Sequence, residues 1–145
     1  MHLTLHTDYS LRVLIYLGLS RDRLSSVSEI SEAYGISRNH IVKVAHRLGA
    51  LGYIETLRGR GGGLRLAREP AKISIGEVVR RTEAMRLVEC FDPERNGCVI
   101  TPACTLKHVL GEAGEAFLSV LDRYTLANLL KQPRRMAQLL SIGSS

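Results

Sequence analysis

The sequence of 145 residues has no tryptophan, and its aromatic residues make up only 5%. Proteins that bind single-stranded nucleic acid stack bases on aromatic side chains, so this scarcity argues against that class. No apolar run approaches the roughly 20 residues that a transmembrane helix needs. The first residues also lack the charged and apolar regions of a secretory signal peptide. We therefore expect one small cytoplasmic protein with no membrane partner.

Cysteine is rare as well, with three residues in one stretch: Cys90, Cys98 and Cys104. An odd number in a single group cannot form a closed set of disulfides, and cytoplasmic thiols stay reduced. Thiolates in that compartment bind zinc or iron–sulfur clusters. Pro102 suits the first position of a helix, which would place Cys104 in the first turn, where the helix dipole favours a thiolate. The cysteines therefore predict a metal site.

The charge is strongly unbalanced, at +6 with histidine neutral. Lysine and arginine release counterions from DNA phosphates when they bind, so an excess of this size favours a nucleic-acid partner. Ordinary solvated basicity is the plainer explanation. With few aromatic residues, double-stranded DNA is the partner that the composition favours.

Three helices separated by short turns are predicted in the first third of the chain. Apolar spacing places two of them over about residues 7–19 and 27–34, and Ser37 caps a third that runs to about Leu51. Gly35 ends the second helix as a left-handed C-cap would. Residues 53–57 and 64–66 predict a hairpin, and helix–turn–helix followed by a hairpin is a winged helix. The expected fold class is mainly α: a winged helix–turn–helix with a β-hairpin wing and a long C-terminal dimerisation helix.

The remainder of the chain is expected to carry the metal site and the dimer contact. A short helix is predicted over residues 75–83, and a long one from Thr101 or Pro102 to about Asp122. The helical pattern continues to Leu130 until Pro133 ends it, and a frayed end is expected from Gln138. The predicted divisions are a DNA-binding domain over 1–83, a cluster-binding loop over 84–104, a dimerisation helix over 102–130 and a tail over 131–145.

The third predicted helix separates into an apolar and a polar face. Rotation by about 100° per residue groups Ile41, Val44, Ala45 and Leu48 on a buried face. The opposite face carries side chains suited to the major groove, where asparagine pairs with adenine and arginine or lysine with guanine. The Gly-rich wing tip carries arginines that suit the DNA backbone or minor groove. The expected DNA-binding residues are Arg38, Asn39, His40, Lys43, His46, Arg47, Arg58, Arg60 and Arg65. A solvated helix face and a merely flexible hairpin are the alternatives.

Two kinds of metal group fit the spacing C-x7-C-x5-C. His108 lies four residues after Cys104, so both would share a helix face and complete a Cys3His zinc site with the other two cysteines. Against zinc, the chain lacks the tight C-x2-C pair that is usual in structural zinc sites. The long, uneven spacing suits a bulky iron–sulfur cluster better.

Four motifs carry a resemblance to a known family: Thr7-Asp8-Tyr9, Gly35-Ile36-Ser37-Arg38-Asn39-His40, the wing over residues 58–66, and Ile100-Thr101-Pro102-Ala103-Cys104. They resemble the NsrR branch of a winged-helix regulator family that also contains IscR, and the likeness extends to Ala127. It implies a homodimeric repressor that binds an operator in double-stranded DNA and senses nitric oxide. It also implies one iron–sulfur cluster per subunit, 4Fe–4S or 2Fe–2S, on Cys90, Cys98 and Cys104.

Three thiolates leave one ligand position of a cluster to be filled. The NsrR-like choice is Asp8, reaching from the partner subunit's first helix, and the IscR-like choice is a histidine shortly after the last cysteine, for which His108 is one residue late. Asp8 also has a plain interpretation as an acid at a helix N-terminus. The loop before Cys98 is longer than this branch implies. Two functions remain as alternatives: an IscR-like regulator that senses cluster status or oxidants, and a zinc-stabilised DNA-binding protein. No nucleophile–base motif predicts an enzyme.

Overall fold

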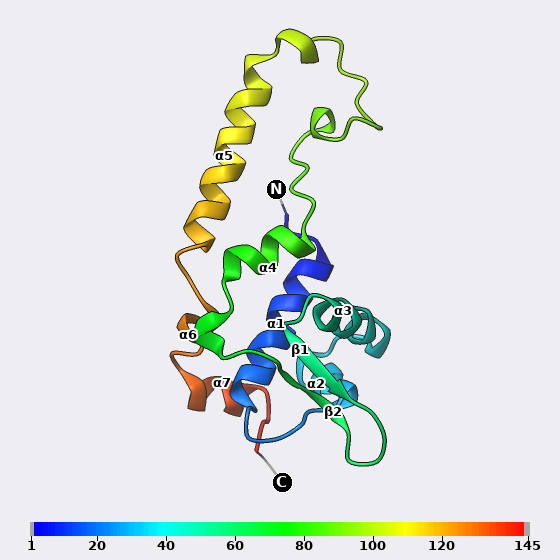
Figure 1. The fold of residues 1–145 in the computed structure, drawn as a ribbon, viewed down its shortest axis with the longest axis vertical. Coiled ribbons are helices and arrows are strands. Elements are labelled where there is room, and N and C mark those ends of the chain that lie inside the picture. Colours follow the sequence, from blue (N-terminus) through cyan, green and yellow to red (C-terminus); the bar gives the residue numbers. More distant parts are fainter. Residues whose placement is uncertain (1, 144–145) are drawn as a thin grey trace.

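The longest helix, α5 (Thr105–Leu121), extends as an arm away from a body of shorter helices and one hairpin (Figure 1). This computed structural model describes residues 2–143. The segment that joins the body to the far end of the arm runs back beside α5 and contains Cys90 and Cys98. The cysteine region and the body therefore occupy different ends of the molecule.

Three helices form the first part of the body: α1 (Leu5–Leu19), α2 (Val27–Tyr34) and α3 (Arg38–Ala50), with α2 and α3 as the helix–turn–helix. Serine hydroxyls cap the last two helices, since Ser26 accepts from the amide of Glu29 and Ser37 from that of His40. Gly35 ends α2 at φ +67°, the left-handed conformation predicted from its position. The predicted core face of α3 is buried, and its members are Ile41, Val44, Ala45 and Leu48.

The wing is an antiparallel hairpin of β1 (Ile54–Leu57) and β2 (Gly63–Leu66). Ser25 and Leu64 exchange two backbone hydrogen bonds of 2.7 and 3.0 Å, which attach the hairpin to the link between α1 and α2. The predicted winged helix–turn–helix is confirmed. The strand predicted over residues 64–66 is confirmed, but the grouping of Arg65 with the tip arginines is wrong, because Arg65 lies within β2 opposite Glu55.

The predicted long helix is interrupted at both ends. A 3₁₀ turn, η3 (Thr101–Ala103), contains Pro102, and Cys104 then adopts extended backbone angles as the N-cap residue of α5. The expectation that Cys104 lies inside the first helical turn is therefore wrong. After α5 the chain turns, and Thr125 and Asn128 form a capping box that starts a separate helix, α6 (Leu126–Leu129). The span from 102 to 130 is thus not one helix.

The C-terminal tail is more ordered than its polar sequence predicts. Pro133 begins a helix, α7 (Pro133–Leu139), because its fixed φ and missing N–H suit the first helical position. Leu140 and Ile142 then pack against the core. The predictions that Pro133 ends helical structure and that the chain frays from Gln138 are wrong through residue 143. Residues 144–145 lie outside the described residues.

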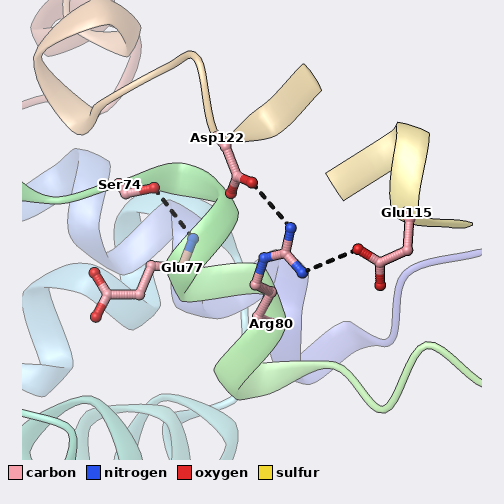
Figure 2. Close-up of polar contacts among 5 residues, drawn as sticks. All are labelled: Ser74, Glu77, Arg80, Glu115 and Asp122. Atoms are coloured by element: carbon pink, nitrogen blue, oxygen red, sulfur yellow. Dashed lines mark hydrogen bonds and ion pairs between the residues drawn. The ribbon is translucent and has the colours of Figure 1, made fainter. Parts of the chain in front are cut away.

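One arginine joins the arm to the body through α4 (Ile75–Thr82), whose N-cap is Ser74 (Figure 2). The guanidinium of Arg80 contacts the carboxylate of Asp122 at 2.9 Å and that of Glu115 at 3.5 Å. Gly76 allows the close approach of α4 to the end of α5, because a Cβ there would overlap the Asp122 carboxylate. The base of the arm is therefore closely packed against α4.

Candidate DNA interface and metal centre

The outer face of α3 carries the side chains with the most freedom to reach DNA. Arg38, Asn39, Lys43 and His46 are exposed, and among the described residues none of these side chains has a hydrogen-bond or ion-pair partner. In Figure 1, α3 and the loop of the hairpin both lie on the right of the body. Arg58 and Arg60 are exposed in that loop and have no such partner within the described chain. These side chains form a candidate surface for a groove and its phosphates.

Three of the predicted DNA-binding residues contact the protein itself. The ring of His40 lies 5.6 Å from that of Tyr9 on α1. Arg47 donates to the backbone carbonyl of Arg81 at 3.4 Å, and Arg65 pairs with Glu55 at 2.9 Å. These contacts restrict the rotation of the three side chains. Their main effect is therefore to stabilise the candidate surface, and they add less to its reach toward DNA. Arg58 and Arg60 are the wing cations that have no such constraint.

The three cysteines line a single cavity of about 300 Å³ at the far end of the arm. Cys90 lies in the 3₁₀ turn η2 (Glu89–Phe91), Cys98 in the loop after it and Cys104 at the cap of α5. All three are half-buried thiols with no disulfide. The other lining residues are mostly apolar, and they are Val88, Ile100, Leu106 and Leu110, with Glu89 and Lys107 as the charged members.

The loop between Cys90 and Cys98 is held in shape by its own polar groups. The buried carboxylate of Asp92 pairs with Arg86 at 2.8 Å and accepts the amide of Glu94. Near the second cysteine, the side chain of Asn96 accepts the Cys98 amide at 3.0 Å, and the hydroxyl of Thr101 donates to the Cys98 carbonyl at 2.9 Å. Because these bonds fix the loop locally, its extra length does not leave Cys98 without support.

The cavity differs from a closed site for a single ion. Across residues 2–143, no three His, Cys, Asp or Glu side chains are grouped so that they could hold one metal ion. The Cys3His tetrahedron predicted with His108 is therefore not assembled, and His108 is exposed and does not line the cavity. A cavity of about 300 Å³ exceeds more than tenfold the roughly 10–15 Å³ that one water needs. Its size and thiols fit a cluster better than an ion.

Asp8, the predicted fourth ligand, lies on α1 and does not line the cavity of its own chain. Both of its carboxylate oxygens accept from Arg12, at 3.1 and 2.9 Å. The same guanidinium lies 5.6 and 5.9 Å from the rings of Tyr9 and Tyr34. The hydroxyl of Tyr34 donates to the Arg12 carbonyl, and burial raises the pKa of this phenol. The Asp8 carboxylate is thus held at a fixed place on the body.

Two cavity residues, Glu89 and Lys107, were not predicted from the sequence. Lys107 lines the cavity and His108 does not. Cys104 is the residue before α5, so helical spacing counted from Cys104 misplaces the inner face of α5 by one residue. The signal that could have identified Glu89 is its position next to Cys90 in the same short turn. Lysine is not a metal-ligating residue type, so a pattern of candidate ligands carries no signal for Lys107.

The fold and the exposed basic helix define a winged-helix DNA-binding protein with a cysteine cavity on a separate arm. The chain belongs to the Rrf2 family, described as iron-dependent transcriptional regulators, whose model matches residues 3–132. It is 56% identical over 144 residues to the HTH-type transcriptional regulator NsrR of Bacillus subtilis, covering 98% of this chain and 99% of the relative. It is 53% identical to NsrR of Shouchella clausii, covering 100% and 99%. The chain is a transcriptional regulator and not an enzyme.

Solved structures share the fold at lower sequence identity. An IscR from T. potens has a TM-score of 0.72 at 24% identity and covers 90% of this chain and 87% of its own. The oxidised form of Staphylococcus aureus CymR has a TM-score of 0.72 at 23% identity, covering 90% and 97%. The described residues contain no helix that is both long and apolar enough to cross a membrane.

Proposed function

We propose that this regulator is a homodimeric repressor that senses nitric oxide through an iron–sulfur cluster on Cys90, Cys98 and Cys104. The observation that carries the proposal is the single cavity that these three cysteines line in a member of an iron-dependent family. Thiolates are the usual ligands of such clusters. The high identity to relatives named NsrR supports nitric oxide as the signal.

The fourth ligand in this proposal is Asp8 of the partner subunit. Within one chain, α5 carries the cysteine region away from the body that bears Asp8 (Figure 1). A second copy is therefore needed to bring this carboxylate to the cavity. When bound, the cluster would supply an iron with an oxygen ligand, which is a weaker donor than thiolate and leaves that iron accessible to nitric oxide. Arg12 would hold the carboxylate in position from behind.

An exposed apolar stripe on α5 supports the dimer. The stripe repeats with alternating steps of three and four residues, and its members are Leu106, Val109, Ala113, Ala116 and Val120. All five are exposed, whereas Leu118 on another face is buried against the body. A 3–4 repeat of this kind forms the seam between two packed helices. Leu106 belongs to the stripe and also lines the cysteine cavity, so the proposed seam would run beside the proposed cluster.

The dimer is tested by placing a charge in the stripe. Val109→Glu should convert the protein to a monomer in light scattering at micromolar concentration, because a buried charge in an apolar seam is not compensated. Ser119→Glu adds the same charge to an exposed position of the same helix outside the stripe and should stay dimeric. A dimer that persists in Val109→Glu would contradict this seam.

Cluster and signal are tested on protein purified without oxygen. The wild type should be coloured and contain acid-labile sulfide, and Cys98→Ser should lose both. Loaded protein should bind its operator, and nitric oxide should release it. Release by oxidants or by cluster loss but not by nitric oxide would favour the IscR-like alternative. Stoichiometric zinc without sulfide, in protein made with ample iron, would falsify the cluster.

A further inference from the structure

A single cation reaches the wall of the cysteine cavity. Lys107 lies in the first turn of α5, is half-buried and lines the cavity with the three cysteines. Among the described residues its ammonium has no carboxylate partner. Within residues 2–143, the one other charged residue that lines the cavity is Glu89, whose carboxylate accepts the Gly97 amide at 3.4 Å and so faces the loop backbone.

We propose that Lys107 balances the negative charge of the cluster, raising its reduction potential and slowing its loss. This inference rests on the proposed cluster. Three thiolates bring more negative charge than an oxidised cluster core can neutralise, and a carboxylate ligand adds to it. The potential of such a cluster depends on its net charge and on its exposure to solvent. A nearby cation stabilises the reduced cluster, which carries the added electron, and so raises the reduction potential.

The cavity wall strengthens this effect. Its remaining members, apart from the cysteines and Glu89, are apolar, and a low local dielectric increases the interaction between charges. A protonated lysine has three donors and no acceptor, so it stabilises thiolates and sulfides without competing as a ligand. Lys107 also occupies the inner face of α5, so that face of the helix presents a cation and not a ligand to the cavity.

A plainer arrangement is that only the aliphatic stem of Lys107 covers the wall while the ammonium stays in water. The two arrangements differ in what a neutral side chain does. If only the stem matters, methionine replaces it without consequence for the cluster. If the charge matters, methionine changes the potential and arginine does not.

The test uses full-length protein loaded with iron and sulfide without oxygen. At a fixed potential, Lys107→Met should lower the ratio of reduced to oxidised cluster about tenfold, which corresponds to about 59 mV for a one-electron couple. It should also lose iron to a chelator severalfold faster. Lys107→Arg should match the wild type. Glu89→Gln should shift the ratio in the opposite direction. Lys131→Met should change nothing, because Lys131 is exposed, lies outside α5 and does not line the cavity.

Each outcome decides between the two proposals. A wild type that takes up no iron and sulfide overturns both the cluster and this inference. A wild type that loads, with Lys107→Met equal to it in potential and in iron loss, overturns the inference alone. If Lys107→Met does not load, Lys107→Gln and Lys107→Arg separate charge from shape, with helical circular dichroism as the check on folding. Loading by the arginine variant alone supports the inference, and equal failure of all three contradicts it.

Discussion

The contact between Gly76 and Asp122 makes the junction of α4 with α5 sensitive to one methyl group. A Cβ at Gly76 would overlap the Asp122 carboxylate and lie 2.8 Å from the backbone nitrogen of that residue. Rotating the carboxylate away breaks its pair with Arg80, but the backbone nitrogen cannot move unless the end of α5 moves. Gly76→Ala should therefore separate the two helices.

Two magnitudes decide the sign of this change. Overpacking against a backbone atom costs about 1–3 kcal/mol, and the loss of the solvent-screened ion pair with Arg80 adds little to it. Alanine in place of glycine in a helix returns up to about 1 kcal/mol. The net result is a loss of about 1–2 kcal/mol in the free energy of unfolding. For a chain of this length, the melting temperature should fall by about 3–8 °C.

The assay is thermal unfolding at one fixed protein concentration, because the proposed dimer would make melting concentration-dependent. Gly49→Ala is the matched control, since Gly49 lies in α3 and a Cβ there meets nothing within 4 Å. It should melt at or above the wild-type temperature. Asp122→Ser in the Gly76→Ala background should recover part of the loss by removing the carboxylate overlap. If Gly76→Ala melts like Gly49→Ala, the close packing of this junction is not as described.

Three further predictions concern DNA binding and its coupling to the arm. Arg60→Ala should weaken binding to all duplexes alike and reduce the slope of log affinity against log salt by about one, measured by salt titration. Lys43→Ala should relax base preference at one operator position by about 1–3 kcal/mol, measured by footprinting. If no operator position is relaxed, Lys43 does not read a base. Glu83→Ala should reduce the difference in operator affinity between loaded and cluster-free protein, whereas Glu94→Ala, an exposed acid in the cysteine loop, should leave that difference intact.

The DNA-binding body could be predicted from local rules in the sequence. Serine caps, the glycine at the end of α2 and the spacing of Ile41, Val44 and Leu48 each act within a few residues, so they predicted α2, α3 and the hairpin closely. Arg65 was grouped with the arginines of the wing tip although the strand predicted over residues 64–66 already contains it. The pairing with Glu55 is visible only once the register is known.

The C-terminal third of the chain was predicted less well because its structure depends on non-local packing. Pro133 carries the same local signal at the start of a helix as after the end of one, and only the packing of Leu140 and Ile142 on the core distinguishes the two. The inner face of α5 likewise depends on Cys104 being a cap rather than a helical residue. That single difference put Lys107 at the cavity in place of the predicted His108.

The cysteine arm and the DNA-binding body are connected by contacts at both ends of the segment that runs from Glu83 to Asp122. At its start, the Glu83 carboxylate accepts the Thr4 amide at 2.8 Å and the Thr4 hydroxyl at 3.0 Å, and that hydroxyl caps α1. At its end, Arg80 ties α4 to Asp122 below α5. These contacts are exposed, so each one alone is weak. We expect a rearranged cysteine loop to disturb them and thereby to change the position of α1 relative to α3, with a coupling of the roughly 1–3 kcal/mol typical of allosteric proteins.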